Sequence, residues 1–149
     1  MRALSYTFFI VISCVISISA NIFSEDIQQS HLIANLPNTF EEFENILARD
    51  LTKYFSNKFK TNVIVEYKLL RNGPTQSGVS YPKFYAWVVI KSSGKMISSG
   101  AVRVAVIDKV RVEVTDYISQ SEIEKNPISI ETVFPQVLCN DIRIRAGVR

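Results

Sequence analysis

The sequence is poor in the side chains that most enzyme and metal sites need. Among its 149 residues it has one histidine, His31, and two cysteines, Cys14 and Cys139. A Ser–His or Cys–His nucleophile pair would have to take its base from His31, near the N-terminus. One histidine and two cysteines also cannot assemble a zinc or transition-metal site of ordinary composition. We therefore expect no metal, no cofactor and no enzymatic activity.

Phosphate-binding loops and concentrated positive charge are lacking as well. Gly73 and Gly78 have neither the spacing nor the following Lys-Ser/Thr of a P-loop. Lys and Arg number 17 against 14 Asp and Glu, for a net charge of +3. The densest basic stretch, Arg143, Arg145 and Arg149, is interpreted as the end of a helix and its tail, since cations favour helix C-termini. A nucleic-acid partner is therefore not expected.

The first twenty residues have the pattern of an export signal. Arg2 supplies the positive start, residues 3–18 carry no charge, and Ser19-Ala20 end the run with small residues. The run is shorter than the ~20 apolar residues of a membrane span. The sequence therefore predicts a signal peptide at residues 1–20, a flexible lead-in at 21–38 and one α+β domain at 39–149, in a periplasmic or secreted protein.

Two alternatives for the N-terminus remain open. The leader could stay uncleaved as an anchor, or Val11-Ile12-Ser13-Cys14 could be a lipoprotein processing site. Membrane contact is then expected only through the leader or a lipidated Cys14. If the leader is removed, Cys139 is the one cysteine left, so no internal disulfide can form. Cys139 lies in an apolar helical pattern and is expected to be a buried thiol.

A long helix is predicted to begin at Thr39. Thr39 and Glu42 have the spacing of a capping box. The apolar residues that follow recur at helical intervals and form one broad face: Phe40, Phe43, Leu47, Leu51, Tyr54 and Phe55. This helix needs a wide apolar surface to pack against.

Four strand-like runs follow the helix. They cover residues 63–70, 84–90, 97–107 and 110–115. Ser92-Ser93-Gly94-Lys95 is typical of a hairpin turn, and Asp108-Lys109 predicts a second one. The last run alternates apolar and polar residues most regularly, which favours an antiparallel sheet.

Short helices are predicted after the strands. Ser119 and Glu122 form a second capping box, and Pro135 can begin a last helix that Gly147 ends.

These elements predict a two-layer α+β fold, with one long N-terminal helix packed on a four-stranded antiparallel meander and short C-terminal helices. This order of elements is similar to cystatin-like folds over residues 39–115. The inhibitory Gln-x-Val-x-Gly motif of cystatins is not present, because Gln76-Ser77-Gly78-Val79-Ser80 has the letters in another order. Protease inhibition is not implied.

Residues 71–83 form the most distinctive segment for binding. The segment joins the first two strands and is longer than a simple hairpin needs, as functional loops often are. It combines two glycines and two prolines with polar side chains. The candidate binding residues are Arg71, Asn72, Thr75, Gln76, Ser77, Tyr81 and Lys83. The alternative is a solvated connection without a ligand.

A second candidate surface is an apolar stripe on the second strand. Tyr81, Tyr85, Trp87 and Val89 fall on one side of the strand. The stripe could dock a partner, or it could be buried beneath the C-terminal helices.

We therefore expect a non-catalytic exported protein that binds an unknown protein or envelope component, as an accessory of a bacterial envelope system. One alternative is a small enzyme with a pocket between helix and sheet and a carboxylate such as Glu66 or Asp116. Another is a homodimer or larger homo-oligomer that pairs its sheets through Tyr85 and Trp87.

Overall fold

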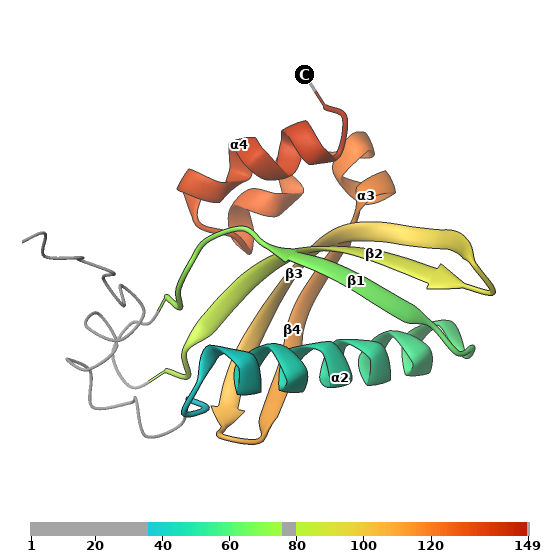
Figure 1. Ribbon diagram of the computed structural model, residues 1–149. Helices are drawn as coiled ribbons and strands as arrows, with labels where there is room; N and C mark the ends of the chain where they lie inside the picture. The colour runs from blue at the N-terminus through green and yellow to red at the C-terminus, as the bar shows by residue number, and fades with distance from the viewer. Residues whose placement is uncertain (1–35, 76–79, 149) are drawn as a thin grey trace, which may run out of the picture.

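A computed structural model describes residues 36–75 and 80–148 of the chain. One long helix lies along one face of a four-stranded antiparallel sheet, and short helices pack against the other face (Figure 1). The α+β plan predicted from the sequence is confirmed, with the helix and the sheet as its two layers. The predicted signal peptide and most of the predicted lead-in lie outside the described residues. Leu36, near the end of that lead-in, is buried against the domain.

The long helix, α2, spans Phe40–Phe59 and begins where the sequence predicted. The Thr39 hydroxyl accepts a hydrogen bond from the Glu42 amide at 3.1 Å. The Glu42 carboxylate accepts from the amide of Asn38, at 3.0 Å, one residue before the position expected in a capping box. The first bond satisfies one of the amides that the first helical turn leaves without a partner, and the second fixes the residue before the N-cap.

The sheet is a meander in which each strand is antiparallel to the next. The strands are β1 (Ile64–Leu69), β2 (Lys83–Ser92), β3 (Lys95–Asp108) and β4 (Arg111–Ser119). Ser93 and Gly94 turn the β2–β3 hairpin with φ of 51° and 77°, as a two-residue turn that follows the strand twist requires. The β3–β4 turn falls on Lys109 and Val110, one residue later than predicted.

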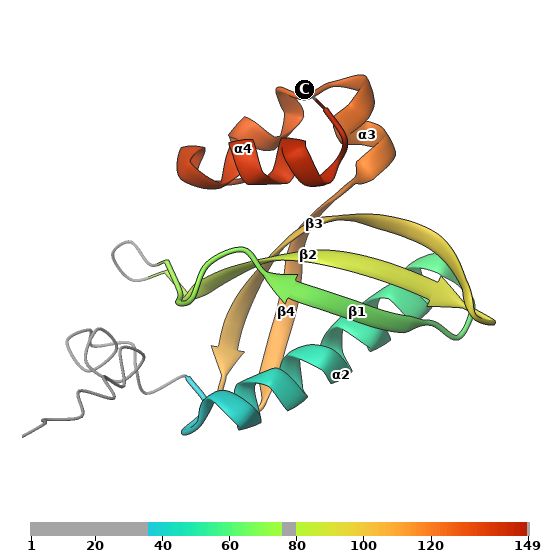
Figure 2. The ribbon, with the colours of Figure 1, turned by 45° about the horizontal axis from the view of Figure 1, so that its top comes forward.

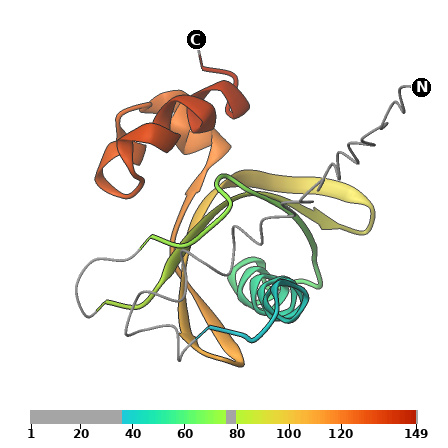
Figure 3. The same ribbon diagram turned by 60° about the vertical axis from the view of Figure 1, so that its left-hand side comes forward.

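The first core lies between α2 and the sheet, which curves around the helix when α2 is viewed end-on (Figure 3). Phe43 meets Phe84 with ring centroids 4.3 Å apart. Phe55 meets Tyr117 edge-on at 4.9 Å. All four rings belong to the first core or pack against it. Aromatic and aliphatic side chains therefore pack together between the two layers.

The C-terminal helices α3 (Gln120–Lys125), η2 (Ser129–Thr132) and α4 (Gln136–Arg145) cover part of the opposite sheet face (Figure 2). The second capping box is present, with Ser119 and Glu122 each bonding the other's backbone amide. Gly147 follows α4 at φ 79°, and the Val148 amide bonds the Arg143 carbonyl at 2.9 Å. This is the glycine-terminated helix end that the sequence predicted.

Arg103 connects the sheet to the C-terminal helices. Its guanidinium pairs with Asp116 across β3 and β4, with Nε 2.7 Å from the carboxylate. Nη1 donates to the Val133 carbonyl at 3.1 Å, between η2 and α4. One side chain thus joins β3 and the edge strand β4 to the segment between η2 and α4. Within the described residues, no helix is long and apolar enough to cross a membrane.

Candidate functional site

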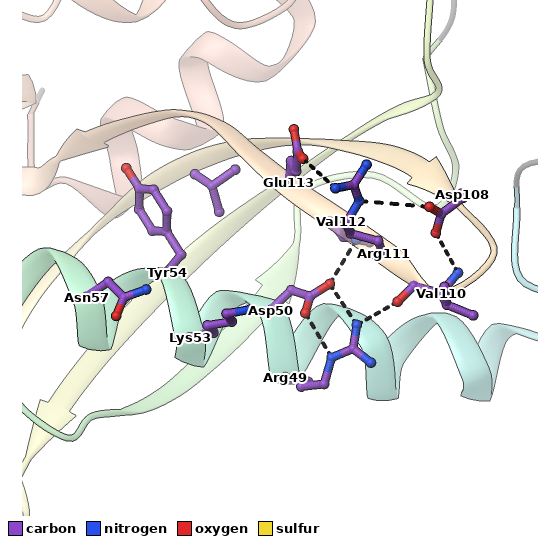
Figure 4. A pocket seen from close by; sticks show the side chains of 11 residues that line it. Arg49, Asp50, Lys53, Tyr54, Asn57, Asp108, Val110, Arg111, Val112 and Glu113 are labelled. Carbon is purple, nitrogen blue, oxygen red and sulfur yellow. Dashed lines mark hydrogen bonds and ion pairs between the residues drawn. The ribbon is translucent and has the colours of Figure 1, made fainter.

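An open groove with a volume of about 790 Å³ runs between α2 and the β3–β4 hairpin. Figure 4 shows it from close by, with α2 on one side and the hairpin on the other. The helix contributes Arg49, Asp50, Lys53, Tyr54 and Asn57, and the hairpin contributes Asp108, Val110, Arg111, Val112, Glu113 and Val114. Five consecutive hairpin residues line the groove. Side chains of a strand alternate between the two faces of the sheet, so a wall made of side chains alone would involve only every second residue. The backbone edge of β4 itself therefore forms one wall.

Strand β4 is at the edge of the sheet, so one side of its backbone has no neighbouring strand. The Val112 amide points to that free side, because it donates to the Asp50 carboxylate at 2.8 Å. The Val110 carbonyl accepts from Arg49 Nη2 at 2.6 Å. Val114 also lines the groove, next to the point where the register between β3 and β4 shifts.

The charges of the groove are largely paired within it. Arg49 bonds Asp50 at 2.8 Å, while Arg111 contacts Asp108 at 3.8 Å and Glu113 at 3.4 Å. No ion pair involves Lys53 in the part of the chain that the structure describes, and its side chain is exposed. Because the carboxylates already have cationic or backbone partners, the groove suits polar recognition better than proton transfer.

Asp50 is the charged residue most firmly held in the groove, with a side chain only 13% exposed. Burial by itself would raise the pKa of Asp50, but hydrogen bonds from Arg49 and the Val112 amide outweigh this and hold the pKa below its usual value. The same pairing raises the pKa of Arg49. Burial raises the pKa of Tyr54, with a smaller contribution from Asp116, so its hydroxyl stays protonated at neutral pH.

Replacing Asp50 by Asn tests whether this charge holds the helix to β4. We expect Asp50→Asn to lower the free energy of unfolding by about 1 kcal/mol at pH 7, because the Val112 amide and Arg49 then bond a neutral acceptor in place of a carboxylate. The folded-state pKa is depressed, so this stabilisation is complete above the unfolded pKa of about 4 and disappears as the pH falls through the folded value. Urea unfolding at pH 7 and near pH 3 measures the difference.

Glu113→Gln is the matched control, since its carboxylate is 54% exposed in the same groove. We expect little change in stability at either pH. Equal losses for the two variants at pH 7, or an Asp50→Asn loss that persists in acid, would contradict the role assigned to Asp50.

The predicted binding loop starts and ends on a well-defined backbone. Thr75 and Lys83 exchange two backbone hydrogen bonds of 2.8 Å, and the Thr75 hydroxyl bonds the Tyr85 hydroxyl at 2.7 Å. Arg71 and Asn72 are exposed, and Tyr81 is 47% exposed. Gln76 and Ser77 lie outside the described residues. Of the predicted loop residues, Arg71, Asn72 and Tyr81 are thus accessible, while Thr75 and Lys83 hold the base of the loop together.

Tyr85 and Trp87, predicted as binding residues, are buried. Tyr85 is 4% and Trp87 9% exposed, and both belong to the second core beneath the C-terminal helices. Tyr85 lies against Phe134, with ring centroids 6.0 Å apart. Tyr85 and Trp87 of the stripe are therefore covered by the chain's own helices, the second of the two explanations that the sequence left open, whereas Tyr81 at its end is exposed. Neither side chain offers a docking or sheet-pairing surface in this structure.

The two carboxylates considered for catalysis lie far apart. Glu66 is on β1 and pairs with Lys91 at 2.5 Å, whereas Asp116 is on β4 and pairs with Arg103. These are the two edge strands, separated by three strand spacings or about 14 Å. They cannot share one small pocket. Among residues 36–75 and 80–148, no group of three or more His, Cys, Asp or Glu could hold a metal ion.

Sequence reasoning missed the groove because its walls come from distant segments. Arg49 and Asp50 lie on the predicted long helix, and the sequence around them gives no indication of β4. One signal was present, since Asp50 falls between Leu47 and Leu51 on the apolar side of α2. A carboxylate at that position needs a partner from another element.

No family model, curated protein or solved structure matches this chain.

Proposed function

We propose that this chain is an exported, non-catalytic protein that binds an extended segment of another envelope protein in its α2–β4 groove. One observation carries the proposal: β4 is an edge strand, and its end at residues 110–114 forms one wall of the groove, where Arg49 and Asp50 already bond the backbone at Val110 and Val112. Strand edges of this kind can pair with an extended peptide through main-chain hydrogen bonds. The protein would act as an accessory in assembling a bacterial envelope system, in the periplasm or outside the cell.

The arrangement of polar groups supports binding over catalysis. The aromatic core leaves the helix–sheet interface filled, and Glu66 and Asp116 lie on opposite edges in separate ion pairs. The groove, in contrast, combines a strand edge, the exposed amide of Asn57 and the exposed ammonium of Lys53. The strand edge and Asn57 can bind the backbone of a peptide, and the Lys53 ammonium can bind a carboxylate of the same peptide.

The groove is tested by changing its two walls separately. Val114→Pro changes the β4 wall at a residue that lines the groove, on an edge strand where proline is tolerated best. Asn57→Trp blocks the groove from the exposed side of α2 without touching β4. We expect either variant to reduce capture of a cross-linked partner from envelope extract at least tenfold, with cooperative thermal unfolding retained.

Arg71→Ala combined with Tyr81→Ala is the matched control, because both residues are exposed on the predicted loop. Partner capture should be unchanged by this double variant. Loss of capture with the loop variant and normal capture with Asn57→Trp would overturn the groove as the binding site and favour the loop.

Export is tested independently of the groove. If residues 1–20 are a cleaved signal, N-terminal sequencing of the protein from the producing cell should begin at Asn21, in the periplasmic or secreted fraction. A chain retained in the cytosol with its leader intact would contradict export.

A further inference from the structure

One end of the molecule gathers exposed apolar side chains and lysines. We call it the hairpin end, and it consists of residues 58–68 and 89–99, which include the C-terminus of α2, most of β1 and the β2–β3 turn. The C-terminal helices leave this end of the sheet uncovered (Figures 1 and 2). Ser92 Oγ donates to the Asn62 carbonyl at 3.0 Å, so the turn is held against the segment between α2 and β1.

The apolar part of the hairpin end is prominent. Ile64 is 69%, Met96 63% and Ile97 42% exposed. The strand register places Ile64 opposite Lys91 and Lys91 opposite Met96, so these three side chains form one row across β1, β2 and β3. Ile64 and Met96 are then about 10 Å apart, two strand spacings. In this row the exposed apolar side chains of Ile64 and Met96 lie on either side of Lys91.

The charge of the hairpin end is strongly positive. It contains five lysines and one carboxylate, that of Glu66, which already pairs with Lys91. Lys60, Lys68 and Lys95 are exposed and make no ion pair within the part of the chain that the structure describes. The whole chain is close to neutral by comparison, with a net charge of +3. Lys91, between the apolar side chains, is thus paired with Glu66, and Lys60, Lys68 and Lys95 at the same end have no ion-pair partner among the described residues.

We infer that the hairpin end binds the surface of a membrane containing anionic phospholipid. Apolar side chains that enter the headgroup region and lysines that meet anionic headgroups are the two contributions that hold proteins at such surfaces. The lysines favour an anionic lipid surface over an apolar protein partner as the ligand of the hairpin end, because an apolar partner would not need positive charge beside it. This contact comes in addition to any made by the leader, and it does not depend on what the α2–β4 groove binds.

The test places a fluorescent reporter on the hairpin end itself, so that binding of the leader to lipid does not produce the same signal. The full chain with Cys14→Ser receives an environment-sensitive fluorophore through Met96→Cys or, as the matched control, through Val137→Cys. Val137 is 79% exposed on α4, on the covered side of the sheet, and Cys139 is buried. The probes are vesicles of phosphatidylcholine alone and with about 30% phosphatidylglycerol, a typical anionic surface.

We expect the fluorophore at position 96 to shift to the blue with anionic vesicles, and the one at position 137 to stay unchanged. Adding Lys60→Gln and Lys95→Gln should raise the lipid concentration needed by about tenfold or more, as should high salt. An equal response at both positions, a response independent of phosphatidylglycerol, or no response at position 96 would overturn the inference. One further outcome would overturn it: the fluorophore at position 96 responds to lipid-free envelope protein and does not respond to vesicles. That result would mean that a protein, and not a membrane, covers the hairpin end.

Discussion

Replacing Phe55 by Ala is expected to lower the free energy of unfolding by about 3–5 kcal/mol, the usual loss when a large buried aromatic side chain is removed. Phe55 is fully buried in the C-terminal half of α2, and its ring packs edge-on against Tyr117 of β4 at 4.9 Å. Both the lost burial and the cavity left between helix and sheet contribute. Urea unfolding followed by circular dichroism, with Trp87 fluorescence as a second probe, measures the loss.

Phe40→Ala serves as the control for this substitution. Phe40 begins the same helix but is 40% exposed. Its removal should change the free energy of unfolding by about 1 kcal/mol or less. Similar losses for the two variants would mean that α2 is not seated on the sheet through Phe55. The groove would then lose the support of one wall, because α2 and β4 are held together by this contact.

The second large effect is expected at Gly100, where β3 passes very close to the end of β4. A Cβ added to Gly100 would lie 2.3 Å from the Ile118 carbonyl oxygen and 2.8 Å from the Ser119 Cα. Both are backbone atoms, so relief requires the strands to separate. Gly100→Ala should therefore lower the free energy of unfolding by about 3 kcal/mol, at the upper end of overpacking losses. A thermal melt and urea unfolding both report it.

Gly73→Ala is the matched control, because a Cβ there meets no atom within 4 Å. Its φ is not in the left-handed region either. We expect a change within about 0.5 kcal/mol, or a slight gain from the stiffer unfolded chain. If Gly100→Ala were equally harmless, the close approach of β3 and β4 where the chain leaves the sheet for α3 would be wrong.

The elements of the fold were largely predictable because their signals are local. Alternation and helical spacing indicate which face of each segment is apolar, and a capping motif depends on residues three positions apart. Thr39, Ser119 and Gly147 accordingly begin or end helices as predicted. The Glu42 carboxylate differs by one residue in the amide it bonds, since two neighbouring amides lie within its reach.

The binding residues were less predictable, because exposure depends on what the rest of the chain covers. The stripe on β2 has the same sequence whether it is buried or free, and only the path of the chain after β4 decides that α3, η2 and α4 lie on Tyr85 and Trp87. Similarly, Ile64, Lys91 and Met96 become neighbours only through strand register. Neither fact can be read from any single segment.

By itself, the sequence determined the order of helix, strands and short helices, the apolar face of α2 and the scarcity of catalytic and metal-binding side chains. These depend on residue type and on spacings of a few positions. The tertiary structure alone decided that Asp50 would bond the edge of β4, and which end of the sheet stays uncovered. Those outcomes depend on contacts between residues about sixty positions apart and on the burial they produce, which no local pattern encodes.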